Sequence, residues 1–122
     1  MRVAVLADDL IWSTRLADAL RAAGAEPRSV RSLGSLRDAL PDVDRVVVDL
    51  TARAYDGLEA IEAAREAGVA VLAVGQHDDH VLRKRALAAG ADRVYAYRKL
   101  FEDGPATFGA WLGAAKPTGA GR

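Results

Sequence analysis

Acidic side chains follow two of the predicted strands. Asp8 and Asp9 come directly after the apolar run 3–7, and Asp49 follows the apolar run 46–48. The carboxyl ends of neighbouring parallel strands meet at one edge of a sheet, where open α/β sheets bind their ligands. Three carboxylates at that edge repel one another unless a cation neutralises them, and Mg²⁺ prefers carboxylate oxygens. The spacing therefore predicts a shared acidic pocket suited to Mg²⁺.

Each of these carboxylates also has a purely structural alternative. Asp8 or Asp9 could cap the helix that follows the first strand. Asp49 could form a local turn at the end of its strand. Because three acidic residues fall at two strand ends that are expected to be neighbours, the pattern favours the pocket over three separate local roles.

The apolar pattern predicts a sheet of parallel strands with helices between them. Short Val- and Leu-rich runs are typical of strands buried on both faces, and apolar residues three and four positions apart indicate helices. We expect strands at 3–7, 26–31, 46–50, 69–74 and 93–97, and helical patterns over 16–23, 33–40, 58–67, 79–89 and 108–115. Five βα units favour a flavodoxin-like (βα)5 doubly wound parallel sheet, α/β in class, with strand order 2-1-3-4-5.

The composition is that of one globular domain. The chain has 122 residues, of which 51% are hydrophobic and 28% charged. Lys+Arg and Asp+Glu each number 17, so the net charge of zero gives no electrostatic reason to bind nucleic acid or an anionic membrane. There is no Cys, which excludes disulfides and thiolate chemistry. We expect a cytoplasmic, bacterial protein without a membrane span, folded over 1–115 and with a flexible tail over 116–122.

Taken in order, the motifs resemble the receiver domain of two-component response regulators. The family's pattern is matched by Asp8-Asp9, Asp49, Asp56-Gly57 and Gly90-Ala91-Asp92. The resemblance implies that Asp49 accepts a phosphoryl group. It also implies that Mg²⁺ is held by Asp8, Asp9, Asp49 and the backbone carbonyl of Thr51.

Three positions depart from the family's pattern. Gly75 stands where receivers have Ser or Thr, and Tyr97 stands where they have Lys, so a phosphoryl group would lose a hydroxyl and an ammonium partner. On an extended strand Arg98 would point to the opposite face, and Lys99 would lie roughly 6–7 Å further along, so only a bulge would bring either to the phosphate. Arg53 replaces the Pro that commonly follows the acceptor by four residues, which predicts a differently shaped loop. We therefore expect an atypical receiver, or pseudo-receiver.

A dense polar cluster lies between the fourth strand and the fourth helix. His77 and His80 flank two aspartates, which could form a transition-metal site, but a helix cap with two surface histidines is the favoured interpretation. His77 could also lean over the acidic pocket and make it sensitive to pH. The basic run 83–85 is expected to be a solvated helix face, and by resemblance the surface of the fourth helix, fifth strand and fifth helix would dock partners.

The sequence leaves three functions open. The favoured one is a signalling interaction module that is not an enzyme beyond self-phosphorylation on Asp49, is monomeric or homodimeric, and binds a sensor kinase or a downstream signalling protein. The second is a working phospho-accepting receiver in which Arg98 or Lys99 reaches the phosphate. The third is a metal-dependent enzyme or small-ligand binder, although Gly-rich phosphate loops and nucleophile elbows are absent from the sequence. An ion pair between Lys99 and Asp49 would favour the working phospho-accepting receiver. A solvent-facing Lys99 would favour the interaction module.

Overall fold

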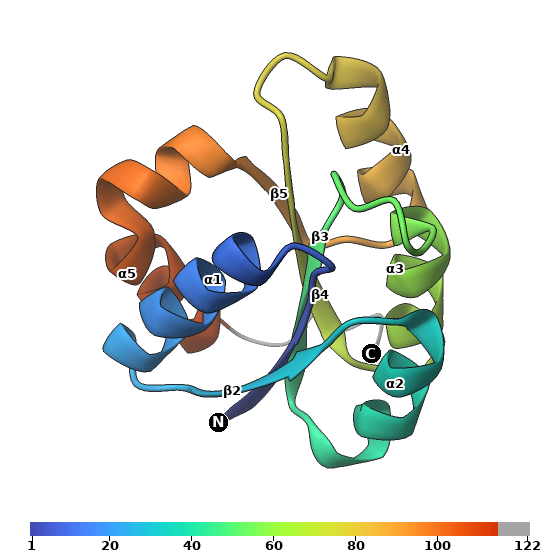
Figure 1. Cartoon of the computed structure of the whole chain (residues 1–122), viewed down its shortest axis with the longest axis horizontal. Helices are drawn as coiled ribbons and strands as arrows, with labels where there is room; N and C mark the ends of the chain where they lie inside the picture. Colours follow the sequence, from blue (N-terminus) through green and yellow to red (C-terminus); the bar gives the residue numbers. More distant parts are fainter. Residues whose placement is uncertain (115–122) are drawn as a thin grey trace.

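The computed structural model describes residues 1–114 and forms one parallel sheet with strand order β2-β1-β3-β4-β5. Helices cover both faces of the sheet (Figure 1). The predicted flavodoxin-like (βα)5 fold and its strand order are confirmed. Along the chain the elements are β1 (Arg2–Leu6), α1 (Leu10–Ala22), β2 (Glu26–Val30), α2 (Leu33–Ala39), a 3₁₀ turn η1 (Leu40–Asp42), β3 (Arg45–Asp49), α3 (Gly57–Glu66), β4 (Ala70–Gly75), α4 (His80–Ala89), β5 (Arg93–Ala96) and α5 (Tyr97–Gly113).

The three central strands are buried on both faces, as their continuous apolar runs predict. On one face the side chains of β1, β3 and β4 pack against α1 and α5, where Phe108 and Trp111 are the largest buried residues. On the other face they pack against α2, α3 and α4, where Leu36 and Ile61 are fully buried. Each such side chain contributes about 1.5–3 kcal/mol on burial, so the two layers hold the strand ends in fixed positions.

The strand register places the acidic residues at the same edge of the sheet. Leu6, the last residue of β1, pairs with Val48, so that Asp49 follows one residue beyond the paired part of β3. Asp49 pairs instead with Val74 of β4. Asp8 and Asp9 follow β1 directly, beside the β1–β3 boundary where the strand order reverses.

The connection between β5 and α5 differs from the sequence-based prediction. β5 ends at Ala96, one residue earlier than predicted, and Tyr97 is the first residue of α5, so the placement of Arg98 and Lys99 on a continuing strand was wrong. The helix also begins well before the predicted range 108–115. It is kinked at Asp103, whose φ of −145° and ψ of 37° are not helical.

Residues 115–122 lie outside the described part of the chain, and with them the last residue of the predicted final helix and the predicted tail 116–122. Within 1–114, no helix combines the length and the apolar character that crossing a membrane requires.

Candidate functional site

Asp49 lies at the centre of the candidate site, at the carboxyl end of β3. Its side chain is 1% exposed. One carboxylate oxygen, Oδ1, accepts hydrogen bonds from the backbone N–H of Thr51 at 2.8 Å and from the Thr51 hydroxyl at 2.7 Å. The local turn that the sequence left open for Asp49 is therefore formed, and Thr51 contacts the carboxylate through its N–H and its hydroxyl.

Asp8 is held by the loop that connects β3 to α3, residues 50–56, which we call the β3–α3 loop. Its Oδ2 accepts hydrogen bonds from the backbone N–H of Arg53 at 2.9 Å and of Ala54 at 3.0 Å. These two bonds lower the pKa of the Asp8 carboxyl, because they stabilise the charged form. The carboxylate is thus ionised and already paired with two N–H groups.

Asp9 caps α1. It has an extended backbone, with φ −91° and ψ 123°, and its side chain accepts a hydrogen bond from the N–H of Trp12 at 3.0 Å. This is the capping role that the sequence left open for Asp8 or Asp9. All three acidic side chains therefore bind backbone N–H groups of neighbouring segments.

Tyr55 occupies the boundary between β1 and β3, and the sequence had not singled it out. Its hydroxyl lies 2.9 Å from the carbonyl oxygen of Leu6 and 2.6 Å from that of Asp49, so it hydrogen-bonds at the ends of both strands. Burial raises the pKa of this hydroxyl, and the negative charges of Asp49 and Asp8 raise it further. Tyr55 therefore stays protonated and joins the two strand ends.

Tyr97 lies beside Asp49 on the side of α1 and α5. Its side chain is 7% exposed, and its hydroxyl has no hydrogen-bond partner among residues 1–114. Burial raises its pKa, and the negative charge and the hydrogen-bonding influence of the nearby Asp49 carboxylate raise it further; the geometry between the two groups is not that of a hydrogen bond. The Tyr97 ring stacks on Trp12 with centroids 3.7 Å apart, and Trp12 in turn lies 5.0 Å from the ring of Phe101.

The two cations considered as replacements for the missing Lys point elsewhere. Arg98 pairs with Glu102 at 3.5 Å, and Lys99 pairs with Asp103 at 3.8 Å, both one helical turn further along α5. The Lys99 ammonium also lies 5.8 Å from the centre of the Tyr95 ring. Within the described chain neither cation forms an ion pair with Asp49.

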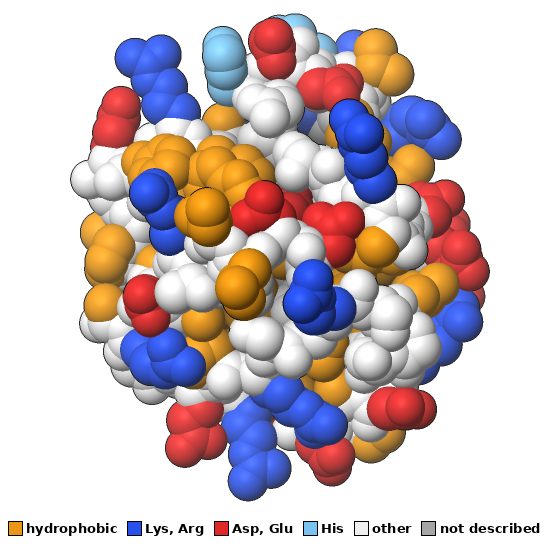
Figure 2. All heavy atoms as spheres, viewed as in Figure 1, with side chains coloured by type: hydrophobic (Ala, Val, Ile, Leu, Met, Phe, Trp, Pro, Cys, Tyr) orange, Lys and Arg blue, Asp and Glu red, His pale blue; other side chains and the backbone are white. Residues whose placement is uncertain are grey.

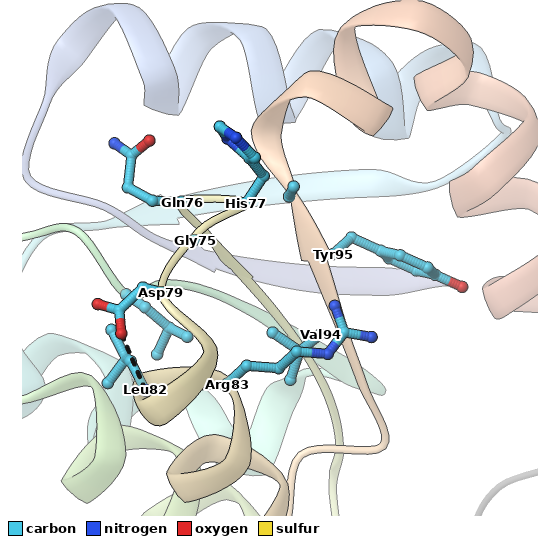
Figure 3. A pocket seen from close by; sticks show the side chains of 10 residues that line it. Gly75, Gln76, His77, Asp79, Leu82, Arg83, Val94 and Tyr95 are labelled. Carbon is cyan, nitrogen blue, oxygen red and sulfur yellow. Dashed lines mark hydrogen bonds between the residues drawn. The ribbon is translucent and has the colours of Figure 1, made fainter.

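Gly75 ends β4 and is buried, next to a small hollow between β4, β5 and α4 (Figure 3). A Cβ at Gly75 would lie 3.6 and 3.7 Å from the Leu50 side chain, which is ordinary van der Waals contact. The hollow offers about 20 Å³, roughly the space of one water molecule. The backbone thus leaves space for a side chain that this sequence does not have.

His77 lies at the rim of this hollow, on the segment that follows β4 (Figure 3). It is exposed, and so is His80, the first residue of α4. Asp79 caps α4 by accepting a hydrogen bond from the N–H of Leu82 at 3.0 Å. The helix cap favoured for this cluster is thus present.

The carboxylates as placed do not fit Mg²⁺. Across residues 1–114, no group of three or more His, Asp or Glu side chains is arranged to hold a metal ion. The Mg²⁺ site at Asp8, Asp9, Asp49 and the Thr51 carbonyl stays a prediction, and one oxygen of Asp8 is already bound by the β3–α3 loop.

Apolar side chains are exposed beside the acidic residues. Leu10 is 72% exposed, Ile11 66% and Phe101 54%. Figure 2 shows hydrophobic and acidic side chains next to one another on this face. Apolar groups gathered in this way are typical of surfaces that contact other molecules.

Comparison with known proteins identifies the fold. No protein-family model matches the chain, and no curated protein sequence matches it significantly. Among solved structures, the BeF3-activated receiver domain of DrrB has a TM-score of 0.80 at 18% identity, covering 93% of this chain and 97% of that one. A response regulator in red-light signalling of R. palustris has a TM-score of 0.77 at 18% identity, covering 96% of this chain and 98% of that one.

A third similar structure is the receiver domain of TorR, the response regulator of the TMAO respiratory system. Its TM-score is 0.73 at 22% identity, and the match covers 91% of this chain and 97% of that chain. At such low identity the likeness establishes the fold alone, and function has to be argued from the site. The chain has the fold of a response-regulator receiver domain.

Proposed function

We propose that this domain is an atypical receiver that acts as a signalling protein-interaction module, and that phosphorylation of Asp49 is weak or absent. In this proposal the domain is not an enzyme. Its partners are proteins, a sensor kinase or a downstream signalling protein, rather than nucleic acid or membrane.

The observation that carries the proposal is the environment of Asp49. A phosphoryl group on this buried carboxylate would add negative charge beside a tyrosine hydroxyl rather than an ammonium group. Arg98 and Lys99, the cations that follow Tyr97 in the sequence, are bound to Glu102 and Asp103. Fixed charges and donors around a transferring phosphoryl group supply most of the catalysis of its transfer. A site without them is expected to react slowly and to hold the product weakly.

Two further features support the proposal. Gly75 offers no hydroxyl to a phosphoryl oxygen. The exposed side chains of Leu10, Ile11 and Phe101 provide apolar area next to the site, as an interaction module requires. The hollow beside Gly75 holds roughly one water, which argues against a small-molecule substrate at that position.

The test is intact-mass spectrometry after incubation with Mg²⁺ and acetyl phosphate, with Asp49→Asn as the matched control. The expected result is no phosphoryl adduct on either protein, while circular dichroism shows that both are folded. One phosphoryl group on the wild type and none on Asp49→Asn would make the domain a working phospho-receiver and overturn the proposal.

A further inference from the structure

The β3–α3 loop places backbone N–H groups where a divalent cation would have to act. Arg53 and Ala54 are consecutive residues, and both their N–H groups point to Oδ2 of Asp8, at 2.9 and 3.0 Å. Successive backbone N–H groups turned toward one point form an anion-binding concavity, which supplies partial positive charge without any ion. The Asp8 carboxylate is therefore neutralised in part by the protein's own backbone.

The same loop also donates hydrogen bonds to the carboxylate of Asp49. The N–H and the hydroxyl of Thr51 both donate to Oδ1 of Asp49. Two carboxylates from different strands are thus bound by one loop. Oδ2 of Asp8 and Oδ1 of Asp49 are thus occupied, so a metal ion bound through these two oxygens would compete with four hydrogen bonds, and hydrogen bonds to charged groups contribute about 1.5–3 kcal/mol each.

The loop is held in this position at several points. The Tyr55 hydroxyl is anchored to the carbonyls of Leu6 and Asp49, directly after the two N–H groups. Asp56 caps α3 by accepting hydrogen bonds from the N–H groups of Leu58 at 2.9 Å and Glu59 at 3.3 Å. The arrangement around Asp8 therefore follows from contacts on both sides of it.

One sequence position decides whether this arrangement can form. Arg53 stands where receivers commonly have proline. Proline has no backbone N–H, so a chain with proline at this position could not make the hydrogen bond to Asp8. The Arg53 side chain is not required for it, because the donor belongs to the backbone.

We infer that the β3–α3 loop takes the place of the divalent cation, so that the acidic site is closed to Mg²⁺ by the N–H groups of Arg53 and Ala54. The site is then kept in a single metal-free state, and the domain's interactions do not depend on Mg²⁺. The inference concerns the same site as the proposed function, but metal binding tests it rather than phosphorylation. The metal-binding experiment can therefore contradict the inference without contradicting the proposed function, and the phosphorylation experiment can do the reverse.

The experiment is isothermal titration of Mg²⁺ into the wild type, Arg53→Pro and the matched control Arg53→Ala. Arg53→Ala removes the side chain and keeps the N–H, whereas Arg53→Pro removes the N–H. We expect the wild type and Arg53→Ala to bind weakly and equally, and Arg53→Pro to bind at least about tenfold more tightly. Adding Asp8→Asn to Arg53→Pro is expected to abolish the gain, because the freed carboxylate is then absent.

Either of two results would overturn the inference. One is tight binding by the wild type, with a dissociation constant of about 1 mM or below. The other is equal affinity of Arg53→Pro and Arg53→Ala. If Arg53→Pro does not fold, amide hydrogen exchange on the wild type decides. Protection of the Arg53 and Ala54 amides without Mg²⁺, unchanged by its addition, supports the inference, and protection that arises only with Mg²⁺ refutes it.

Discussion

Trp12 and Tyr97 stack on each other with ring centroids 3.7 Å apart and planes inclined by 38°. The contact joins the first turn of α1 to the first residue of α5, and the Tyr97 hydroxyl lies near Asp49. It puts an aromatic ring where the family resemblance places a lysine. The stacking rings offer Asp49 no positive charge, and Tyr97 buries a hydroxyl without a hydrogen-bond partner within residues 1–114.

Removing the Tyr97 hydroxyl is therefore not expected to lower the free energy of unfolding. Tyr97→Phe keeps the stacked ring and relieves the desolvation of an unpaired polar group, so its free energy of unfolding should equal that of the wild type or exceed it by up to about 1 kcal/mol. Tyr97→Ala also removes the ring, and a loss of about 3–5 kcal/mol is expected. Urea unfolding measures both. A clear loss in Tyr97→Phe would show that the hydroxyl has a partner in solution.

Placing the family's residues at the two altered positions should make Asp49 a better phosphoryl acceptor. In the double variant Gly75→Thr with Tyr97→Lys, a hydroxyl returns to the position where the family resemblance places one, and the space at Gly75 accepts a Cβ at 3.6 Å from Leu50. The lysine supplies the charge that a phosphoryl group requires. We expect acetyl phosphate to label the double variant at least about 10²-fold faster than the wild type.

The control for this gain is the triple variant that also carries Asp49→Asn, which should not be labelled. If the double variant stays unlabelled while it is folded, Gly75 and Tyr97 do not explain the weak or absent phosphorylation that we propose, and the closure of the site to Mg²⁺ inferred for the β3–α3 loop becomes the remaining explanation.

Tyr55 should contribute to stability through its hydroxyl. Tyr55→Phe removes the hydrogen bonding to the carbonyls of Leu6 and Asp49, and we expect a loss of about 1–2 kcal/mol in the free energy of unfolding. Tyr95→Phe is the matched control, because within residues 1–114 its hydroxyl has only a long contact of 3.5 Å with Arg93. A Tyr55→Phe protein as stable as Tyr95→Phe would contradict the role assigned to Tyr55.

Asp92 should make stability depend on pH. Burial raises the pKa of this carboxyl, opposed in part by its hydrogen bond from the Val71 N–H at 2.8 Å. The folded protein therefore keeps the proton to higher pH than the unfolded chain does. Stability linked to Asp92 increases as the pH falls through the folded pKa toward the unfolded value of about 3.9. At neutral pH the charged carboxylate is destabilising.

Asp92→Asn keeps an oxygen acceptor for Val71 and removes the charge. We expect it to be more stable than the wild type at pH 7, with a difference that shrinks toward about pH 4. Thermal unfolding of both proteins across this range is the measurement. A variant that is less stable than the wild type at pH 7 would show that the charge of Asp92 is favourable, for example toward Arg45.

Much of the fold followed from the sequence, because burial leaves a clear pattern. The apolar runs of β1, β3 and β4 are continuous because helices cover both faces of these strands. Five βα units predicted the strand order, and the strand order predicted that the acidic residues lie at one edge of the sheet. The residue at which β5 ends could not be predicted from the sequence. Tyr95 and Tyr97 alternate as in a strand, but the i,i+4 pairs Arg98–Glu102 and Lys99–Asp103 belong to a helix that begins at Tyr97.

The contacts within the site were harder to predict, because most of them use the backbone. The N–H groups that bind Asp8 are common to every residue except proline, so no residue type indicates which of them will reach a carboxylate. The absence of proline at Arg53 was the one sequence feature that pointed to an altered shape of this loop. Tyr55 gave no local pattern at all, since its role depends on two carbonyls from distant strands.

The position of Trp12 has a practical consequence for experiments. The chain has two tryptophans. Trp12 is half-buried against Tyr97 beside the acidic residues, whereas Trp111, a residue of α5, is buried in the core. The intrinsic fluorescence of the protein thus contains one emitter that senses the site and one that senses global unfolding. A Trp111→Phe variant would leave a label-free optical probe of whatever binds next to Asp49.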